Sequence, residues 1–261
     1  MNEKKYELTG DFIEILGRKL YRIRALRDFS YVKTGDLGGY IENENNLSHD
    51  GDAWVYDNAS VYEYASVYGD ARVYGDAWVY GYASIYGDAE VCGGAKVHGA
   101  ASVCDNAKVC DNAKVCDDAW VYGYASVYGD ARVYGDASVC DNAKVCDNAW
   151  VYGYASVYGD AKVCDNAVIS GDARVYGDAE ICGNADIKSD LDYATIGGFG
   201  PHRRTTTFFR CKDGFIRVTC EFFYGAINEF REKVKEIHGD NKYTKEYLMI
   251  ADLMEMHFAE N

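Results

Sequence analysis

The sequence is short of proline, of basic residues and of long apolar runs. Its 261 residues include a single proline, and 27 lysines and arginines face 42 aspartates and glutamates, for a formal net charge of -15 at pH 7. Such a charge disfavours direct binding to nucleic-acid phosphates or to anionic lipid. No apolar run reaches the ~18 residues of a membrane-spanning helix, and the charged residues 1–7 lack the apolar core of a signal peptide. We therefore expect a soluble, cytoplasmic protein with no membrane or direct nucleic-acid partner.

Glycine, tyrosine and cysteine are abundant, and they follow a six-residue repeat. Between residues 53 and 187 the pattern Gly/Asp, Asp/Asn/Tyr, Ala, x, Val/Ile, Tyr/Cys recurs without an insertion, with alanine at 23 positions and valine or isoleucine at 23 more. Alanine and valine two residues apart lie on one face of a short strand. Glycine and asparagine tolerate the positive φ of the corners, where aspartate or asparagine can hydrogen-bond the turn.

This period is typical of the hexapeptide repeat of a parallel β-helix. Three hexads close one triangular coil, so the 23 hexads predict an all-β prism of about seven to eight coils. The absence of proline from the repeat fits, because each strand must donate hydrogen bonds to a neighbouring coil. We assign residues 51–190 to this β-helix.

The segments on either side of the repeat differ from it in composition. Residues 1–50 contain short strand patterns and glycine turns, and we expect them to form a small β cap over the exposed edge of the first coil. Residues 191–204, with glycines, the proline and basic residues, are expected to be a linker.

The last segment, residues 205–261, predicts a small α+β unit. Two alternating stretches, 205–211 and 215–222, flank an Asp213–Gly214 hairpin turn. Two helical patterns follow, one ending at Gly239 and one reaching about Phe258. This unit either caps the last coil or carries an interaction of its own.

The N-terminal segment also carries a family resemblance. The stretches LYRIRALRDF (20–29), GDLGGYIE (35–42) and NLSHDG (46–51), together with the coil, resemble the YdcK-like family of bacterial and prophage hexapeptide-repeat proteins. The resemblance covers about residues 1–190 and implies a left-handed β-helix. It carries no reaction and no catalytic residue over to this chain, so it bears on the fold rather than on function.

Residues 18 apart should stack in columns on the outside of the prism. Stacked tyrosines either support the neighbouring strands or form a binding face, and both interpretations stay open. The densest predicted patch in the middle of the rod combines Tyr134, Tyr152, Trp150 and Arg132, and we take it as the candidate interaction site. Three tryptophans should lie beside a cation of the next coil: Trp54 beside Arg72, Trp78 beside Lys96, and Trp150 beside Arg132.

The ten cysteines are expected to be free thiols, because the expected compartment is reducing. Cys146, Cys164 and Cys182 should stack one strand apart, which allows a disulfide or a metal. However, the repeat has no C-x-x-C and its only histidine is His98, so a tetrahedral site lacks ligands. We predict that the thiols fill space, with no metal and no cofactor.

The leading functional hypothesis is a non-catalytic structural or interaction protein that binds a protein partner or itself. One alternative is an acidic nucleic-acid mimic, since residues 51–188 carry 21 acids against 9 bases. Another is an acyltransferase-like enzyme with His98 as general base, although no loop interrupts the hexads and Gly99 and Ala100 supply no orienting carboxylate. We therefore predict no catalytic residue, and we expect no basic stripe on the rod.

Overall fold

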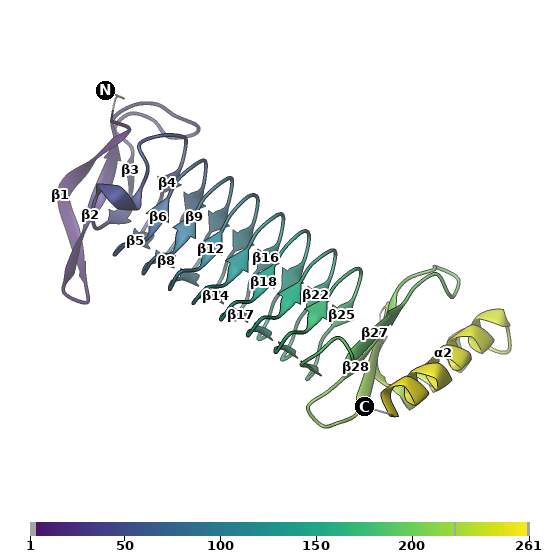
Figure 1. Ribbon diagram of the computed structural model, residues 1–261. Helices are drawn as coiled ribbons and strands as arrows, with labels where there is room; N and C mark the ends of the chain where they lie inside the picture. The colour runs from purple at the N-terminus through teal and green to yellow at the C-terminus, as the bar shows by residue number, and fades with distance from the viewer. Residues whose placement is uncertain (1–3, 222, 260–261) are drawn as a thin grey trace.

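The structure is a computed structural model that describes residues 4–221 and 223–259, and its main body is a β-solenoid of about eight turns (Figure 1). Within the described residues, 23 two-residue strands follow one another at six-residue intervals and form three parallel sheets. Each strand pairs with the strand 18 residues away, as Ser84 does with Ser102. The predicted triangular β-helix is therefore confirmed.

The three sheets are named here as three faces of the prism. Face 1 contains β5 (Ser60–Val61), β8 (Trp78–Val79), β11 (Lys96–Val97), β14 (Lys114–Val115), β17 (Arg132–Val133), β20 (Trp150–Val151), β23 (Val168–Ile169) and β26 (Asp186–Ile187). Face 2 contains β4 (Trp54–Val55), β7 (Arg72–Val73), β10 (Glu90–Val91), β13 (Lys108–Val109), β16 (Ser126–Val127), β19 (Lys144–Val145), β22 (Lys162–Val163) and β25 (Glu180–Ile181). Face 3 contains β6 (Ser66–Val67), β9 (Ser84–Ile85), β12 (Ser102–Val103), β15 (Trp120–Val121), β18 (Ser138–Val139), β21 (Ser156–Val157) and β24 (Arg174–Val175).

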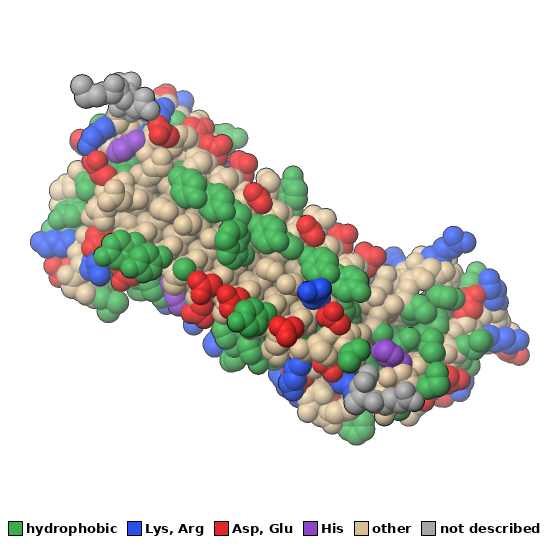
Figure 2. Space-filling view, viewed as in Figure 1, with side chains coloured by type: hydrophobic (Ala, Val, Ile, Leu, Met, Phe, Trp, Pro, Cys, Tyr) green, Lys and Arg blue, Asp and Glu red, His purple; other side chains and the backbone are tan. Residues whose placement is uncertain are grey.

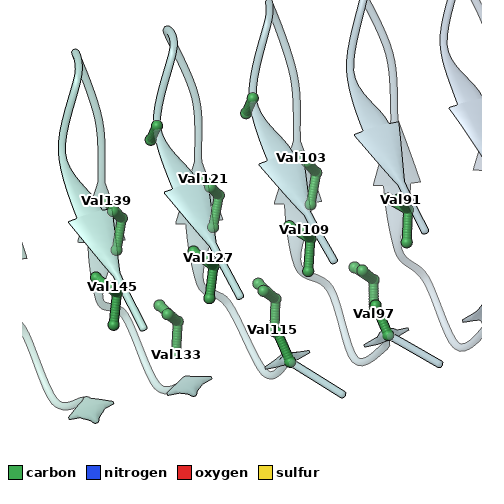
Figure 3. Packing of buried hydrophobic residues seen from close by; sticks show 14 of the residues in the cluster. Val91, Val97, Val103, Val109, Val115, Val121, Val127, Val133, Val139 and Val145 are labelled. Atoms are coloured by element: carbon green, nitrogen blue, oxygen red, sulfur yellow. The ribbon is translucent and has the colours of Figure 1, made fainter. Parts of the chain in front are cut away.

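The interior is made of the alanines and the valines or isoleucines of the repeat, as predicted. Their side chains are buried along the whole rod and form one continuous core. In Figure 3 the labelled valines occupy equivalent places in successive coils, and all of them belong to this one core. Because each hexad contributes only one alanine and one valine or isoleucine to the interior, the interior is too thin to hold a ligand.

The corners use positive φ at the first corner residue. This residue is glycine in most coils and otherwise an acidic residue with φ between 54° and 60°, namely Asp57, Glu63, Asp105, Asp111, Asp117, Asp141, Asp147 or Asp165. The expectation that asparagine takes this conformation is wrong. The asparagines of the repeat instead follow this residue, as Asn106 follows Asp105. The carboxylate of the first corner residue accepts a hydrogen bond from the next coil, as Asp105 Oδ2 does from Gly123 N at 3.1 Å.

The N-terminal segment forms β1 (Tyr6–Ile15), β2 (Arg18–Ala25), β3 (Leu37–Ile41) and the 3₁₀ turn η1 (Glu44–Asn46). β1 and β2 pair antiparallel, and so do β2 and β3. β3 also pairs parallel with β5, and Leu47 bridges to Val67. The solenoid thus begins within the predicted cap, because the buried Ile41 and Leu47 continue its interior rows without the Ala-x-Val pattern.

Two buried polar side chains complete the first coil. In the rod, the N–H of each x residue donates to an alanine carbonyl of the next coil. On face 1 the first alanine, Ala59, accepts from Tyr40 N of β3, but the first alanines of faces 2 and 3 have no such backbone donor among the described residues. Lys5 Nζ donates to Ala53 O at 2.7 Å on face 2, and Asn46 Nδ2 donates to Ala65 O at 2.8 Å on face 3. Both side chains are fully buried, and they replace the missing coil.

The C-terminal unit is a four-stranded antiparallel sheet with two helices: β27 (Tyr193–Ile196), β28 (Thr206–Arg210), β29 (Ile216–Cys220), β30 (Phe223–Ala226), α1 (Ile227–His238) and α2 (Lys242–Ala259). The helices and the hairpin agree with the sequence prediction, although Phe222, the last residue of the second predicted strand, lies outside the described residues. β27 lies in the predicted linker, because its residues pair with β28. Its four-residue strand pattern is too short to stand out from the turn-rich sequence around it.

This unit caps the last coil. β28 packs against β25 and β26, and N–H groups on two faces of the final coil donate to side chains there or in the turn before β27. Arg174 N donates to Asp190 Oδ1 at 2.7 Å, and Glu180 N donates to Thr207 Oγ1 at 3.1 Å. The sequence left open whether this unit caps the last coil or carries an interaction of its own. The contacts in the structure support capping.

One cysteine pair departs from the prediction that all thiols are free. Cys92 and Cys110 follow β10 and β13 on face 2 and form a disulfide, with their Cα atoms 4.6 Å apart. Stacking in one column brings the two sulfurs together, and a prediction from the expected reducing compartment alone takes no account of this proximity. The other eight cysteines are free.

We expect Ala131→Leu to destabilise the protein by about 1–3 kcal/mol, because Ala131 is fully buried in the interior and three added carbons would overpack it. Urea unfolding followed by circular dichroism measures the change. Asp136→Leu, at an exposed corner of the same coil, is the matched control and should have little effect. Equal stability of the two variants would show that Ala131 does not face a packed interior.

We expect the contribution of Lys5 to stability to rise with pH. Burial, with a smaller effect of Arg27, lowers the pKa of Lys5 from 10.5 to about 8. Between these two values the unfolded chain binds the proton more strongly than the folded chain, so stability increases with pH in this window. The difference in unfolding free energy between the parent and Lys5→Met should therefore grow from pH 8 to 10.5. A pH-independent difference would contradict this, and comparing matched proteins cancels the titration of other groups.

Candidate interaction surface

The structure brings the four predicted patch residues together on face 1. Arg132 in β17 and Trp150 in β20 are directly paired, and the Arg132 guanidinium lies 4.8 Å from the Trp150 ring. Tyr134 and Tyr152 follow these strands and stack with ring centroids 4.9 Å apart. Tyr134 also meets Trp150 edge-on at 6.3 Å, so the four side chains form one contiguous patch.

The patch is accessible to a partner and is held in place. Trp150 is 37% exposed and Arg132 is exposed, whereas the two tyrosines are half-buried. Burial raises the pKa of Tyr134, so its hydroxyl remains a neutral hydrogen-bonding group at neutral pH. Figure 2 shows hydrophobic side chains in rows along the rod, with acidic side chains gathered beside them.

The patch belongs to a longer column that sequence reasoning missed. Strand pairing stacks Trp78, Lys96, Lys114, Arg132 and Trp150 in consecutive coils. We call this column the cationic stripe. The expectation that the rod has no basic stripe is therefore wrong. The stripe could have been found in the sequence, because its members are the x residues at 18-residue intervals.

The charges of the cationic stripe are not neutralised by ion pairs. Among the residues that the structure describes, no carboxylate oxygen lies within 4.0 Å of the charged nitrogens of Lys96, Lys114 or Arg132. The tryptophans at its ends make the contacts instead, with Lys96 Nζ 4.8 Å from the Trp78 ring. By contrast, Arg72 on face 2 pairs with Glu90 at 2.9 Å.

Trp54 lies beside Arg72 of the next coil, as predicted. However, the Arg72 guanidinium pairs with Glu90, and the Trp54 ring packs elsewhere. Trp54 is 1% exposed and packs under the N-terminal cap, with its ring 5.3 Å from Phe29 and 6.1 Å from Tyr6. The cap covers the first coil of face 2, and this could not be read from the repeat alone.

His98, the histidine considered as a general base, is part of an aromatic column beside the cationic stripe. Its ring stacks on Tyr80 at 4.8 Å, and Tyr80 stacks on Tyr62 at 5.1 Å. Burial lowers the pKa of His98, and nearby Asp117 opposes this effect. The imidazole therefore packs as a neutral aromatic ring in this column.

An open groove of about 560 Å³ adjoins Trp150. Its walls include Asp130, Arg132, Asn148, Trp150, Asn166 and Lys212. Lys212 comes from the β28–β29 turn and donates from Nζ to Asn166 O at 2.9 Å. The groove therefore extends the patch toward the C-terminal unit and adds a further cation, two amides and the Asp130 carboxylate.

Comparison with known proteins agrees with the fold. Residues 65–81 and 125–141 match the family model described as the YdcK β-solenoid repeat. A comparison with curated proteins finds no match. In the described part of the chain, neither helix has the length and apolar character needed to cross a membrane.

A double-mutant cycle between Arg132 and Trp150 should give a coupling of about 0.5–1 kcal/mol, as expected for a partly exposed cation–π contact. Each residue is changed to alanine singly and together, and stability is measured by urea unfolding. Lys114 and Trp150, two coils apart, form the control pair and should show no coupling. A coupling as small as that of the control pair would count against the observed stacking.

Proposed function

We propose that this chain, a β-solenoid in which residues 65–81 and 125–141 match the YdcK β-solenoid repeat, is a non-catalytic interaction scaffold. Its binding surface is face 1, where the cationic stripe meets the aromatic patch and groove at Trp150. The partner is a protein that presents an extended acidic segment. A second copy of the chain, whose corners are acidic, is the other partner that this chemistry would accept.

The observation that supports this proposal is the cationic stripe itself. Three cations, Lys96, Lys114 and Arg132, stand in consecutive coils of a chain of net charge -15, and within residues 4–221 and 223–259 no carboxylate oxygen lies within 4.0 Å of their charged nitrogens. Charged groups that a fold does not pair internally are available to a complementary surface. The flanking tryptophans supply the large aromatic contacts that dominate binding energy.

The spacing of the stripe suits an extended peptide. Neighbouring strands lie about 4.8 Å apart, so the three cations span about 10 Å, while side chains on one side of an extended peptide recur every 6.6–6.8 Å or so. Two acidic side chains of such a peptide can therefore reach all three cations. Because the rod is packed along its length, little conformational entropy is lost on binding.

The two alternative functions have weaker support. The acidic charge of the rod has a structural role at the corners, where carboxylates such as those of Asp105 and Asp165 accept backbone hydrogen bonds from the next coil. His98 packs in an aromatic column. The eight free cysteines favour the reducing cytoplasm as the compartment of this interaction.

The proposal predicts that Tyr134→Ser/Trp150→Ser/Tyr152→Ser weakens binding of a fluorescent oligoglutamate peptide, measured by anisotropy, while leaving the buried interior intact. Lys96→Ser/Lys114→Ser should weaken the same binding and reduce its dependence on salt. Trp120→Ser/Tyr158→Ser/Tyr176→Ser on face 3 replaces the same residue types and is the control.

Unchanged binding by both face 1 variants, or an equal loss in the face 3 control, would refute the assignment of face 1. Light scattering of the same proteins separates the two partner classes. If the parent is an oligomer that only the face 1 variants dissociate, the partner is a second copy of the chain.

A further inference from the structure

A second cluster, independent of face 1, lies on face 2 toward the C-terminal end. Cys146, Cys164 and Cys182 each follow a face 2 strand, and the pairing of β19, β22 and β25 stacks them in one column. Their exposed fractions are 3%, 6% and 7%. We call these three residues the thiol ladder, and the proposed function does not use it.

Two corner carboxylates reach the thiol ladder. The ligand atoms of Cys146, Asp147 and Cys164 all lie within 4.8 Å of one another, and so do those of Cys164, Asp165 and Cys182. Cys146 Sγ lies 3.2 Å from Asp147 Oδ2. The sequence argument found too few ligands because it counted histidines and C-x-x-C spacings, whereas the fold brings aspartates to the cysteines.

The corner conformation explains why these carboxylates lie beside the sulfurs. Asp147 and Asp165 adopt φ of 59° and 57°, and Asp165 Oδ2 accepts from Gly183 N at 2.9 Å. The side chain therefore extends along the rod axis toward the next coil, where the next cysteine lies. Each carboxylate has a second oxygen for a ligand, and both aspartates are exposed, which leaves a path from solvent.

Two sulfurs and one carboxylate oxygen are a donor set that zinc-group cations accept. Zinc binds thiolate at about 2.3 Å and carboxylate at about 2.0–2.2 Å, usually in a tetrahedron. Two thiolates on such an ion lie about 3.8 Å apart, so ligand atoms now within 4.8 Å of one another need only side-chain rotation to converge. Water from the solvent side can occupy the fourth position.

We propose that the thiol ladder binds one thiophilic divalent cation of the zinc group, with Cys164 as the ligand common to both possible positions. The disulfide elsewhere in this column offers a contrast. Between Cys92 and Cys110 the corner residue is Gly93, which has no carboxylate, and that pair forms a disulfide. The thiol ladder has an aspartate at both intervening corners.

Binding releases protons, because the cysteines are thiols before the cation arrives. The hydrogen bond from Cys146 lowers the pKa of Cys164, but the contact with Cys182 and burial outweigh it and raise the pKa to about 12. The hydrogen bond to Cys164, followed by burial, raises the pKa of Cys146. Each cation bound by two cysteines therefore forms two metal–sulfur bonds and displaces two protons to solvent.

The test is a titration of the full chain with Cd²⁺, followed by the thiolate-to-cadmium charge-transfer absorbance and by proton release. The parent carries Cys92→Ser/Cys110→Ser, so that reductant can be used before desalting. We expect saturation at one Cd²⁺ and two protons per chain, with displacement by excess Zn²⁺. Cys164→Ser should lose this saturable band, whereas Cys140→Ser, which removes a buried thiol on face 3, should keep it.

Circular dichroism checks that each variant is folded. If Cys164→Ser does not fold, Cys146→Ser/Cys182→Ser isolates Cys164 and should also lose the band. The absence of a saturable band in the parent, or a band of equal size in a folded Cys164→Ser variant, would overturn the site.

Discussion

Hydrogen bonding between successive coils is the constraint on which the whole molecule depends. Because the x residue of each coil donates to an alanine carbonyl of the next, the first coil leaves acceptors without donors and the last leaves donors without acceptors. The two ends are accordingly closed by opposite chemistry. The donors Lys5 and Asn46 lie at the start, and the acceptors Asp190 and Thr207 lie at the end.

The same constraint does not restrict which side chains occupy the outward positions, so these positions can carry the residues that serve function. Inward positions accept only small apolar side chains, and corners accept only residues that tolerate positive φ. The x positions and the positions after valine carry neither requirement. Faces 1 and 2 use them differently. Face 1 exposes cations beside tryptophans, whereas on face 2 Arg72 and Lys108 pair with Glu90, Lys162 pairs with Glu180, and the thiol ladder is buried.

Three features could be predicted because each depends only on the period of six and its multiple of 18. They are the interior, the three-sided form, and the grouping of Arg132, Tyr134, Trp150 and Tyr152. Features outside the period could not be predicted. β3 enters the solenoid through Gly39, Tyr40 and Ile41, which lack the alanine of the repeat. The burial of Trp54 depends on a cap folding over it, and the carboxylates beside the thiol ladder depend on a corner rotamer. The cationic stripe was predictable in principle from the 18-residue columns, whereas its lack of ion pairs required side-chain positions.

The strict register of the rod also limits how its length can change during evolution. Removing 18 residues would shorten the prism by one coil, about 4.8 Å, and every later side chain would keep its face. Removing six residues would preserve the interior equally well but turn everything downstream by one side of the triangle. Such a deletion between Arg132 and Trp150 would carry the two side chains onto different faces. Whole-coil duplication therefore conserves a binding surface, whereas single-hexad duplication shuffles it, and both leave the fold intact.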